Sequence, residues 1–114
     1  SVNAADTVLA RIRTLPPGAR LGLVSVSATL LRMAAEIIAG LQRDDLDVVP
    51  LTADNRAGIR TAATRFDLVL VDSVCAAAVQ AIASKPVHVF PLIPETSIQA
   101  LMQHLPLESL RRQD

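Results

Sequence analysis

Several residue types are scarce in this chain, and their scarcity excludes some kinds of site. The sequence has no tryptophan and no tyrosine, so Phe66 and Phe90 are its only large aromatic residues. Recognition of single-stranded nucleic acid by base stacking on aromatic rings is therefore not expected. Cys75 is the only cysteine, which excludes an internal disulfide bond and suits a reducing compartment. We therefore expect a cytoplasmic protein.

An excess of one charge and long apolar runs are also missing. The 11 basic and 11 acidic residues give a formal net charge of zero, so the chain lacks the electrostatic footprint of a nucleic-acid-binding domain. No apolar run is long enough to span a bilayer, and no membrane partner is expected. The glycine patterns of the dinucleotide fold and of the P-loop are both absent, and we expect no cofactor.

The two histidines do not form a recognisable metal or catalytic site. His88 and His104 lie on separate predicted elements, with no cysteine or carboxylate at ligand spacing beside either. Nothing in the sequence brings either histidine near a serine to form a Ser-His-Asp arrangement. We therefore assign no metal ligand and no catalytic residue.

Apolar, partly β-branched runs alternate with helical patterns, which indicates an α/β fold. The predicted strands are residues 21–26, 47–51, 67–71 and 86–90, and the predicted helices are residues 5–15, 29–41, 55–66, 74–84 and 95–104. Right-handed crossovers between such strands give a three-layer, parallel, four-stranded sheet of order 2-1-3-4, a flavodoxin-like half with a leading N-terminal helix. Pro50, late in the second run, predicts an edge strand or a strand end.

The sequence divides into a leading helix, one α/β domain and a tail. Residues 1–18 are the predicted leading helix and linker, residues 19–107 the α/β domain, and residues 108–114 a charged tail. The length of 114 residues suits one domain with a sizeable core. Because the chain starts at Ser1 without an initiator methionine, we expect it to be a piece of a longer protein.

Small hydroxyl residues gather where the predicted strands end. In an open parallel sheet, ligands bind beyond the carboxyl ends of the strands, where the strand order reverses, which here is between the first and third strands. Free N–H groups and helix dipoles at that edge favour an anion. We therefore predict a site for a small anionic metabolite. Its predicted ligand-binding residues are Ser25, Ser27, Thr29, Thr52, Arg56, Asp72 and Ser73.

A structural role is the commoner explanation for several of these residues. Ser27 and Ser73 have the positions of ordinary helix N-caps, and Asp72 that of a capping or loop acid. An aspartate after the third strand also occurs in receiver domains, but their acidic pair and late lysine are absent here. The phosphorylated cysteine of sugar-phosphotransferase IIB domains follows the first strand, whereas Cys75 follows the third. We therefore expect a buried, unreactive thiol at Cys75.

Three stretches give the chain a resemblance to a known family. They are LPPGARLGLVSVS at residues 15–27, DLVLVDS at residues 67–73 and PVHVFPL at residues 86–92. With the helix after the first stretch, they resemble the C-terminal effector domain of bacterial GntR-type transcription regulators. The resemblance covers most of the chain and carries no specific ligand residue across. It implies a small-molecule effector, a homodimer, and DNA binding through a helix-turn-helix domain that this chain does not contain.

Three functions follow from the sequence. The favoured one is a non-catalytic, small-molecule-sensing and dimerising effector domain of a bacterial transcription regulator, because no catalytic constellation is present. The alternative is a phosphotransfer or other enzyme component that uses strand-end residues such as Ser25, Asp72 or Cys75, since a helix N-terminus can lower the pKa of a thiol. The third is a purely structural dimerisation module.

Overall fold

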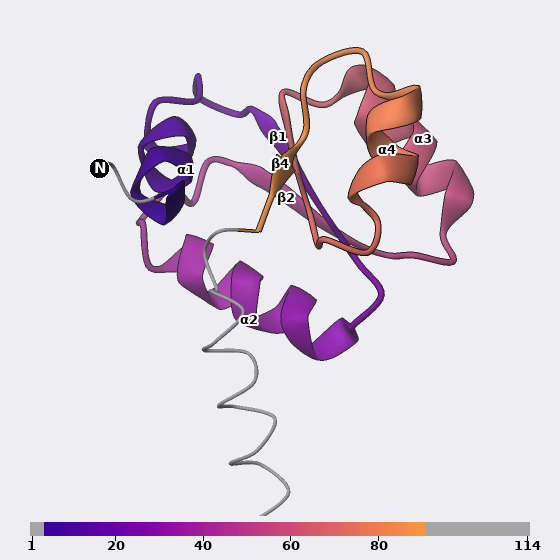
Figure 1. Ribbon diagram of the computed structural model, residues 1–114. Helices are drawn as coiled ribbons and strands as arrows, with labels where there is room; N and C mark the ends of the chain where they lie inside the picture. The colour runs from indigo at the N-terminus through magenta and orange to yellow at the C-terminus, as the bar shows by residue number, and fades with distance from the viewer. Residues whose placement is uncertain (1–3, 91–114) are drawn as a thin grey trace, which may run out of the picture.

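Helices and strands alternate along residues 4–90, the part of the chain that the computed structural model describes (Figure 1). The elements are α1 (Ala4–Arg13), β1 (Arg20–Ser25), α2 (Ala28–Ala39), β2 (Asp47–Thr52), α3 (Arg56–Arg65), β3 (Leu68–Val71), α4 (Ala76–Ile82) and β4 (His88–Val89). This order confirms the predicted leading helix followed by alternating strands and helices.

The four strands form one parallel sheet of order β2-β1-β3-β4, as the sequence predicts. In the register of the sheet, Leu23 of β1 lies between Pro50 of β2 and Leu70 of β3. Pro50 therefore lies in an edge strand, where a residue without an N–H group is tolerated. The prediction made from this proline is confirmed.

Helices cover both faces of the sheet and so give three layers (Figure 1). Successive side chains of a strand point to opposite faces. Leu21 and Leu23 accordingly pack in the core beneath α1 and α2, whereas Val24 packs in the core beneath α3 and α4. This double coverage explains why β1 and β3 read as continuous apolar runs in the sequence.

Gly22 allows α3 to lie close to β1. A Cβ atom at this position would be 3.2 Å from Ala62 Cβ and 3.3 Å from Phe66 Cδ2. Both neighbours are buried and belong to the α3 side of the core. A side chain at Gly22 would require Ala62 or Phe66 to shift by a few tenths of an ångström, so glycine suits the close approach of α3, which also forms one wall of the groove described below.

The last described helix and strand, α4 and β4, are shorter than the predicted 74–84 and 86–90. Ahead of α4, the Asp72 carboxylate accepts a hydrogen bond from the backbone N–H of Cys75, which holds this segment in a turn. Ahead of β4, Pro86 has no N–H group to donate to the sheet. Both elements therefore start later than their apolar patterns do.

Some predictions concern residues that are not described. The predicted helix 95–104 and the charged tail 108–114 lie outside residues 4–90, so the domain boundary at residue 107 stays a prediction. Among the described helices, none combines the length and the hydropathy needed to cross a membrane.

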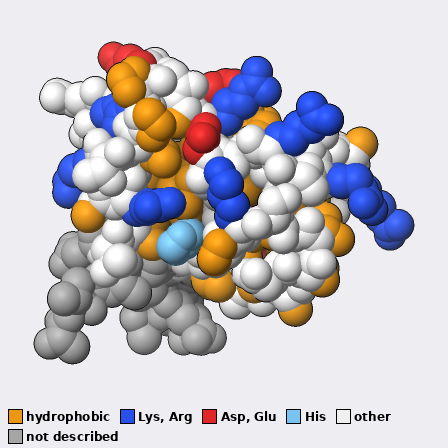
Figure 2. All heavy atoms as spheres, turned by 90° about the horizontal axis from the view of Figure 1, so that it is seen from above, with side chains coloured by type: hydrophobic (Ala, Val, Ile, Leu, Met, Phe, Trp, Pro, Cys, Tyr) orange, Lys and Arg blue, Asp and Glu red, His pale blue; other side chains and the backbone are white. Residues whose placement is uncertain are grey.

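Charge is unevenly spread over the surface although the net charge is zero. The face seen from above in Figure 2 carries more Lys and Arg than Asp and Glu side chains. Within residues 4–90 two ion pairs form, Arg20 with Asp47 at 3.4 Å and Arg43 with Asp45 at 2.9 Å. The first pair is exposed and contributes little to stability, whereas the second belongs to a larger network.

Arg43, which follows α2, holds the end of α1. Its Nη1 donates to the carbonyl oxygens of Ile12 at 3.1 Å and Arg13 at 2.8 Å, and its Nη2 donates to that of Leu15 at 2.8 Å. The last carbonyl groups of a helix lack hydrogen-bond donors within the helix, and the Arg43 guanidinium provides such donors. Asp45 orients the guanidinium by accepting hydrogen bonds from Nε and Nη2, both at 2.9 Å.

We call Arg43 and Asp45 the α1 clamp. Asp45 also accepts a hydrogen bond from the backbone N–H of Gly18 at 3.0 Å, in the turn that leads into β1. The hydrogen bonds from Arg43 and Gly18 hold the pKa of the Asp45 carboxyl well below its usual range. The hydrogen bond to Asp45 in turn raises the pKa of Arg43. The clamp therefore fixes α1 and the following turn against the body of the fold.

Arg43→Ala should loosen α1, because it removes the guanidinium donors from the carbonyl groups of Ile12 and Arg13 and leaves the Asp45 carboxylate with only the N–H of Gly18. We expect the melting temperature to fall by roughly 5 °C or more and amide hydrogen exchange to accelerate in α1. Arg32→Ala is the matched control, since Arg32 is exposed on α2 and should change the melting temperature by less than roughly 2 °C. Equal melting temperatures of the two variants would contradict the clamp.

Candidate functional site

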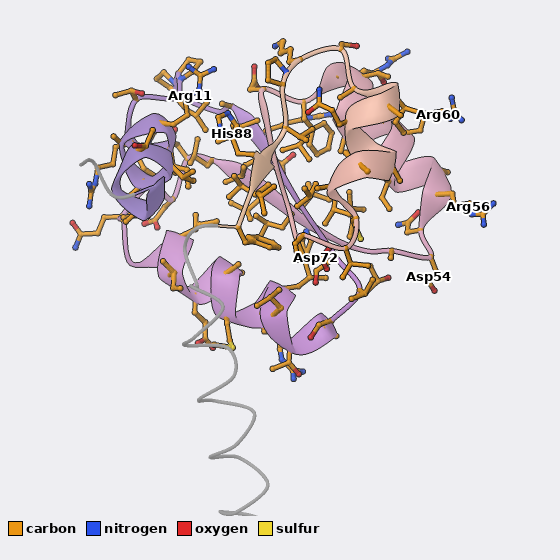
Figure 3. All side chains as sticks on the ribbon, in the orientation of Figure 1. Arg11, Asp54, Arg56, Arg60, Asp72 and His88 are labelled. Carbon is orange, nitrogen blue, oxygen red and sulfur yellow. The ribbon has the colours of Figure 1, made fainter. Side chains whose placement is uncertain are left out.

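Ser25, which ends β1, and Asp72, which follows β3, meet at the carboxyl edge of the sheet; Asp72 is labelled in Figure 3. Ser25 Oγ donates to Asp72 Oδ2 at 2.7 Å, and the N–H of Val26 donates to the same oxygen at 2.8 Å. Asp72 Oδ1 accepts from the N–H of Cys75 at 2.7 Å. Ser25 Oγ itself accepts from the N–H of Ser27 at 3.0 Å. We call these five residues the Asp72 network.

The Asp72 carboxylate is buried and has no cationic partner among residues 4–90. Burial acts to raise the pKa of Asp72, but the hydrogen bonds from Val26, Ser25 and Cys75 together outweigh it, so that the pKa lies below its usual value. Asp72 is therefore ionised at neutral pH. Hydrogen bonds to the charged form, rather than an ion pair, stabilise this buried charge.

This internal carboxylate lies where the sequence predicts a bound anion. The N–H of Val26, which begins the loop after β1, and the N–H of Cys75, which ends the loop after β3, both donate to Asp72. Ser27 Oγ accepts from the N–H of Leu30 at 3.1 Å and caps α2, which confirms its predicted N-cap role. The same expectation was wrong for Ser73, because α4 begins later and Cys75 has the N-cap position without a side-chain cap.

The remaining predicted site residues lie apart from this network. Thr29 is exposed on α2, and Ser73 is exposed after β3. Thr52 Oγ1 donates to Asp54 Oδ1 at the end of β2. Arg56 is exposed at the start of α3. A ligand-binding role for the seven residues stays a prediction, and the structure brings only the three in the Asp72 network together.

A groove of about 550 Å³ lies beside the Asp72 network, between α3 and α4. We call it the α3–α4 groove. Its floor includes the buried side chains of Val24, Ile59 and Val79. Its walls include Val26 and Val74, from the loops after β1 and β3. The volume falls within the usual range of small-molecule pockets, and an apolar lining is typical of such pockets.

Exposed apolar side chains surround the opening of this groove. Val26 is 57% exposed, Val74 72% and Ile82 36%. Isolated exposed aliphatic residues need no explanation, but several around one hollow indicate an interaction site. The sequence analysis missed this feature. Its signal was two apolar residues in the loops after the strands: Val26, which directly follows β1, and Val74, which comes after Asp72 and Ser73 in the loop after β3.

Among residues 4–90, the charged residues that line the groove are Arg56 and Arg60 of α3. They are four residues apart and therefore on one face of the helix. Figure 3 shows both side chains reaching outward from α3. Both residues are exposed and line the groove, so we place their guanidinium groups at its mouth. Within residues 4–90, neither side chain forms an ion pair. The mouth of the groove is therefore positively charged.

Cys75 lies between the groove and the Asp72 network. Burial, and then the hydrogen bond with Asp72 and its negative charge, raise the pKa of the Cys75 thiol to about 11. The thiol is therefore almost entirely protonated at neutral pH, as expected for an unreactive cysteine. Among residues 4–90 there is also no cluster of three or more His, Cys, Asp or Glu that could bind a metal ion.

Asp72→Asn should lower stability and weaken its dependence on acid pH. The pKa of Asp72 is lower in the folded protein than in the unfolded chain. The ionised carboxylate therefore stabilises the folded state fully at pH values above its ordinary pKa of about 3.9. This stabilisation is lost as the pH falls through the lower pKa of the folded protein. We expect the variant to lose about 2 kcal/mol of unfolding free energy at pH 7 and to show a flatter decline below about pH 5.

Urea denaturation between pH 3 and pH 7 measures both effects. Asp44→Asn is the control, because Asp44 is exposed and has no hydrogen bond or ion pair with residues 4–90. If Asp72→Asn and Asp44→Asn gave the same stability profile, the Asp72 network would not have the stabilising role described here.

A comparison with protein families matches residues 7–92, about three quarters of the chain, to the C-terminal domain of the cyanobacterial PlmA-type GntR regulator. This match confirms the GntR resemblance seen in the sequence. No curated protein and no solved structure was found to match the chain.

Proposed function

We propose that this chain, which belongs to the family of C-terminal domains of cyanobacterial PlmA-type GntR regulators, senses a small molecule on behalf of a transcription regulator. In this proposal the effector binds in the α3–α4 groove, and another part of the regulator contacts DNA. The role of the domain is to bind and to change conformation, without catalysing a reaction.

The observation that carries this proposal is the α3–α4 groove itself. It is an apolar hollow of about 550 Å³ with an exposed apolar rim and two arginines at its mouth. It adjoins the carboxyl edge of the sheet, where open α/β sheets bind their ligands. The positive mouth supports an anionic effector, the class that the sequence predicts.

The chemistry of the strand-end residues supports a non-catalytic role. Both oxygens of Asp72 accept hydrogen bonds from the protein, and Ser25 Oγ donates to this carboxylate. The thiol of Cys75, with its pKa of about 11, is a weak nucleophile at neutral pH. These residues hold the loops together, which is sufficient to explain their presence at the strand ends.

A thermal-shift screen with carboxylates, sugar phosphates and inorganic phosphate tests the proposal. A ligand at about 100 times its Kd stabilises the folded state by about 2.7 kcal/mol, which raises the melting temperature by roughly 10 °C in a domain of this size. Ala78→Trp, which places an indole in the groove, should abolish the shift.

Ala77→Trp is the matched control for this screen. Ala77 is the preceding residue of α4, is exposed, and does not line the groove. This variant should keep the full ligand-induced shift. A shift that survives Ala78→Trp would mean that the ligand binds elsewhere, and the groove would not be the effector site.

We also propose that two copies of the chain associate along β4. Within residues 4–90, β4 is an edge strand, with β3 on one side and no strand on the other. Its residue Val89 is 45% exposed. An edge strand presents N–H and C=O groups that can pair with another chain, and an exposed apolar residue favours such pairing.

Sedimentation equilibrium should therefore show an average mass that rises with concentration toward that of a dimer. Val89→Lys should shift the equilibrium toward the monomer, because a lysine on an edge strand opposes pairing. Ala81→Lys, at an exposed position of α4, should leave the mass unchanged. A wild-type chain that stays monomeric at high concentration would contradict the association.

A further inference from the structure

We propose that the α3–α4 groove binds an amphipathic anion, with an apolar chain along the floor and a single anionic head between Arg56 and Arg60 at the mouth. This inference rests on the proposed function and adds the chemical class of the effector. Fatty carboxylates of medium length are the simplest members of that class.

The floor of the groove selects for an apolar chain. Val24, Ile59 and Val79 are each at most 9% exposed. Apart from Cys75 and the two arginines, every residue in the lining is aliphatic. A sugar or another hydroxyl-rich molecule would leave its hydroxyl groups without hydrogen-bond partners on this floor, which disfavours its binding.

Cys75 does not change the apolar character of the floor. Its thiol keeps its proton at neutral pH, because burial and the neighbouring Asp72 raise its pKa to about 11. The Asp72 carboxylate itself does not line the groove. An apolar chain in the groove therefore meets no charged group of the described residues until it reaches the mouth.

The mouth of the groove selects for an anion. Arg56 and Arg60 stand four residues apart on α3, an arrangement that slightly destabilises a helix because the two positive charges repel each other. The described part of the chain contributes no acidic residue to the lining that could offset them. An anionic head at the mouth would accept charge-assisted hydrogen bonds from either guanidinium, whose planar fork fits a carboxylate.

The volume of the groove and the exposed apolar residues around its opening favour a small amphipathic molecule over a hydrophilic anion. A volume of about 550 Å³ accommodates a chain that buries apolar surface. Inorganic phosphate could engage the arginines but would leave Val26, Val74 and Ile82 exposed. An alkyl chain would cover them, and each added methylene should tighten binding by up to about fourfold until the groove is filled.

Calorimetric titration of the 114-residue chain with carboxylates of four to ten carbons tests the inference. We expect affinity to rise with chain length and octanoate to bind at least about tenfold more tightly than 1-octanol, which has the same chain and no charge. Inorganic phosphate should bind more weakly than octanoate. Higher salt should weaken the binding of octanoate but not that of 1-octanol.

Variants at the mouth separate the head from the chain. In the double variant Arg56→Gln/Arg60→Gln, the affinity for octanoate should fall to that for 1-octanol, while the affinity for 1-octanol stays unchanged. Arg65→Gln is the matched control, since Arg65 is exposed on the same helix and does not line the groove. This control should keep the full preference for octanoate.

The outcomes distinguish failure of this inference from failure of the proposed function. Equal affinities for octanoate and 1-octanol would overturn the anionic class. Tight binding of phosphate or of a sugar phosphate, with no gain from chain length, would overturn the amphipathic class. In both cases the groove remains the effector site if Ala78→Trp abolishes binding. If octanoate binds Ala78→Trp as tightly as wild type, both the inference and the groove as effector site are wrong.

Discussion

The buried carboxylate of Asp72 is the constraint on which the carboxyl edge of the sheet depends. It joins the loop after β1 to the loop after β3 by accepting from Ser25, Val26 and Cys75. A buried charge is tolerated only with such partners. The Asp72 carboxylate thereby occupies the edge of the sheet at which the strand order reverses. The α3–α4 groove lies beside it, on the side of the sheet covered by α3 and α4.

Two of these loop residues belong to both the Asp72 network and the groove. Val26 and Cys75 line the groove and also donate backbone hydrogen bonds to Asp72. The loop after β1 continues into α2, whose N-cap is Ser27. Arg43 follows α2 and donates hydrogen bonds to the end of α1. An effector that moves the loop after β1 would therefore act on a continuous set of contacts that ends at α1.

Apolar periodicity is a local property, and for this reason the strands could be predicted from the sequence. Their order followed from the right-handed crossover rule, and the edge position of Pro50 from its missing N–H group. Ser27 was predicted as a cap for the same reason, since its partner is three residues away. The Asp72 network joins residues 46 and 47 positions apart, and Arg43 reaches back 28 to 31 residues to α1. No local pattern encodes these contacts. The groove arises from the packing of α3 against α4. Of the seven ligand-binding residues predicted from the sequence, only Arg56 lines it.

The wall of the groove formed by α4 is weakly stabilised on its own. This helix has only 7 residues, its N-cap residue Cys75 makes no side-chain capping bond, and Ile82 near its end is 36% exposed. Val79 is its one buried residue. Elements with few buried contacts open most readily, and ligand-binding segments are drawn from them. A ligand in the groove would add apolar contacts where α4 lacks them, so binding would order this helix and extend the core beneath it. If the proposed effector binds there, part of its binding free energy would stabilise α4, and an apolar ligand is the kind that can provide such contacts.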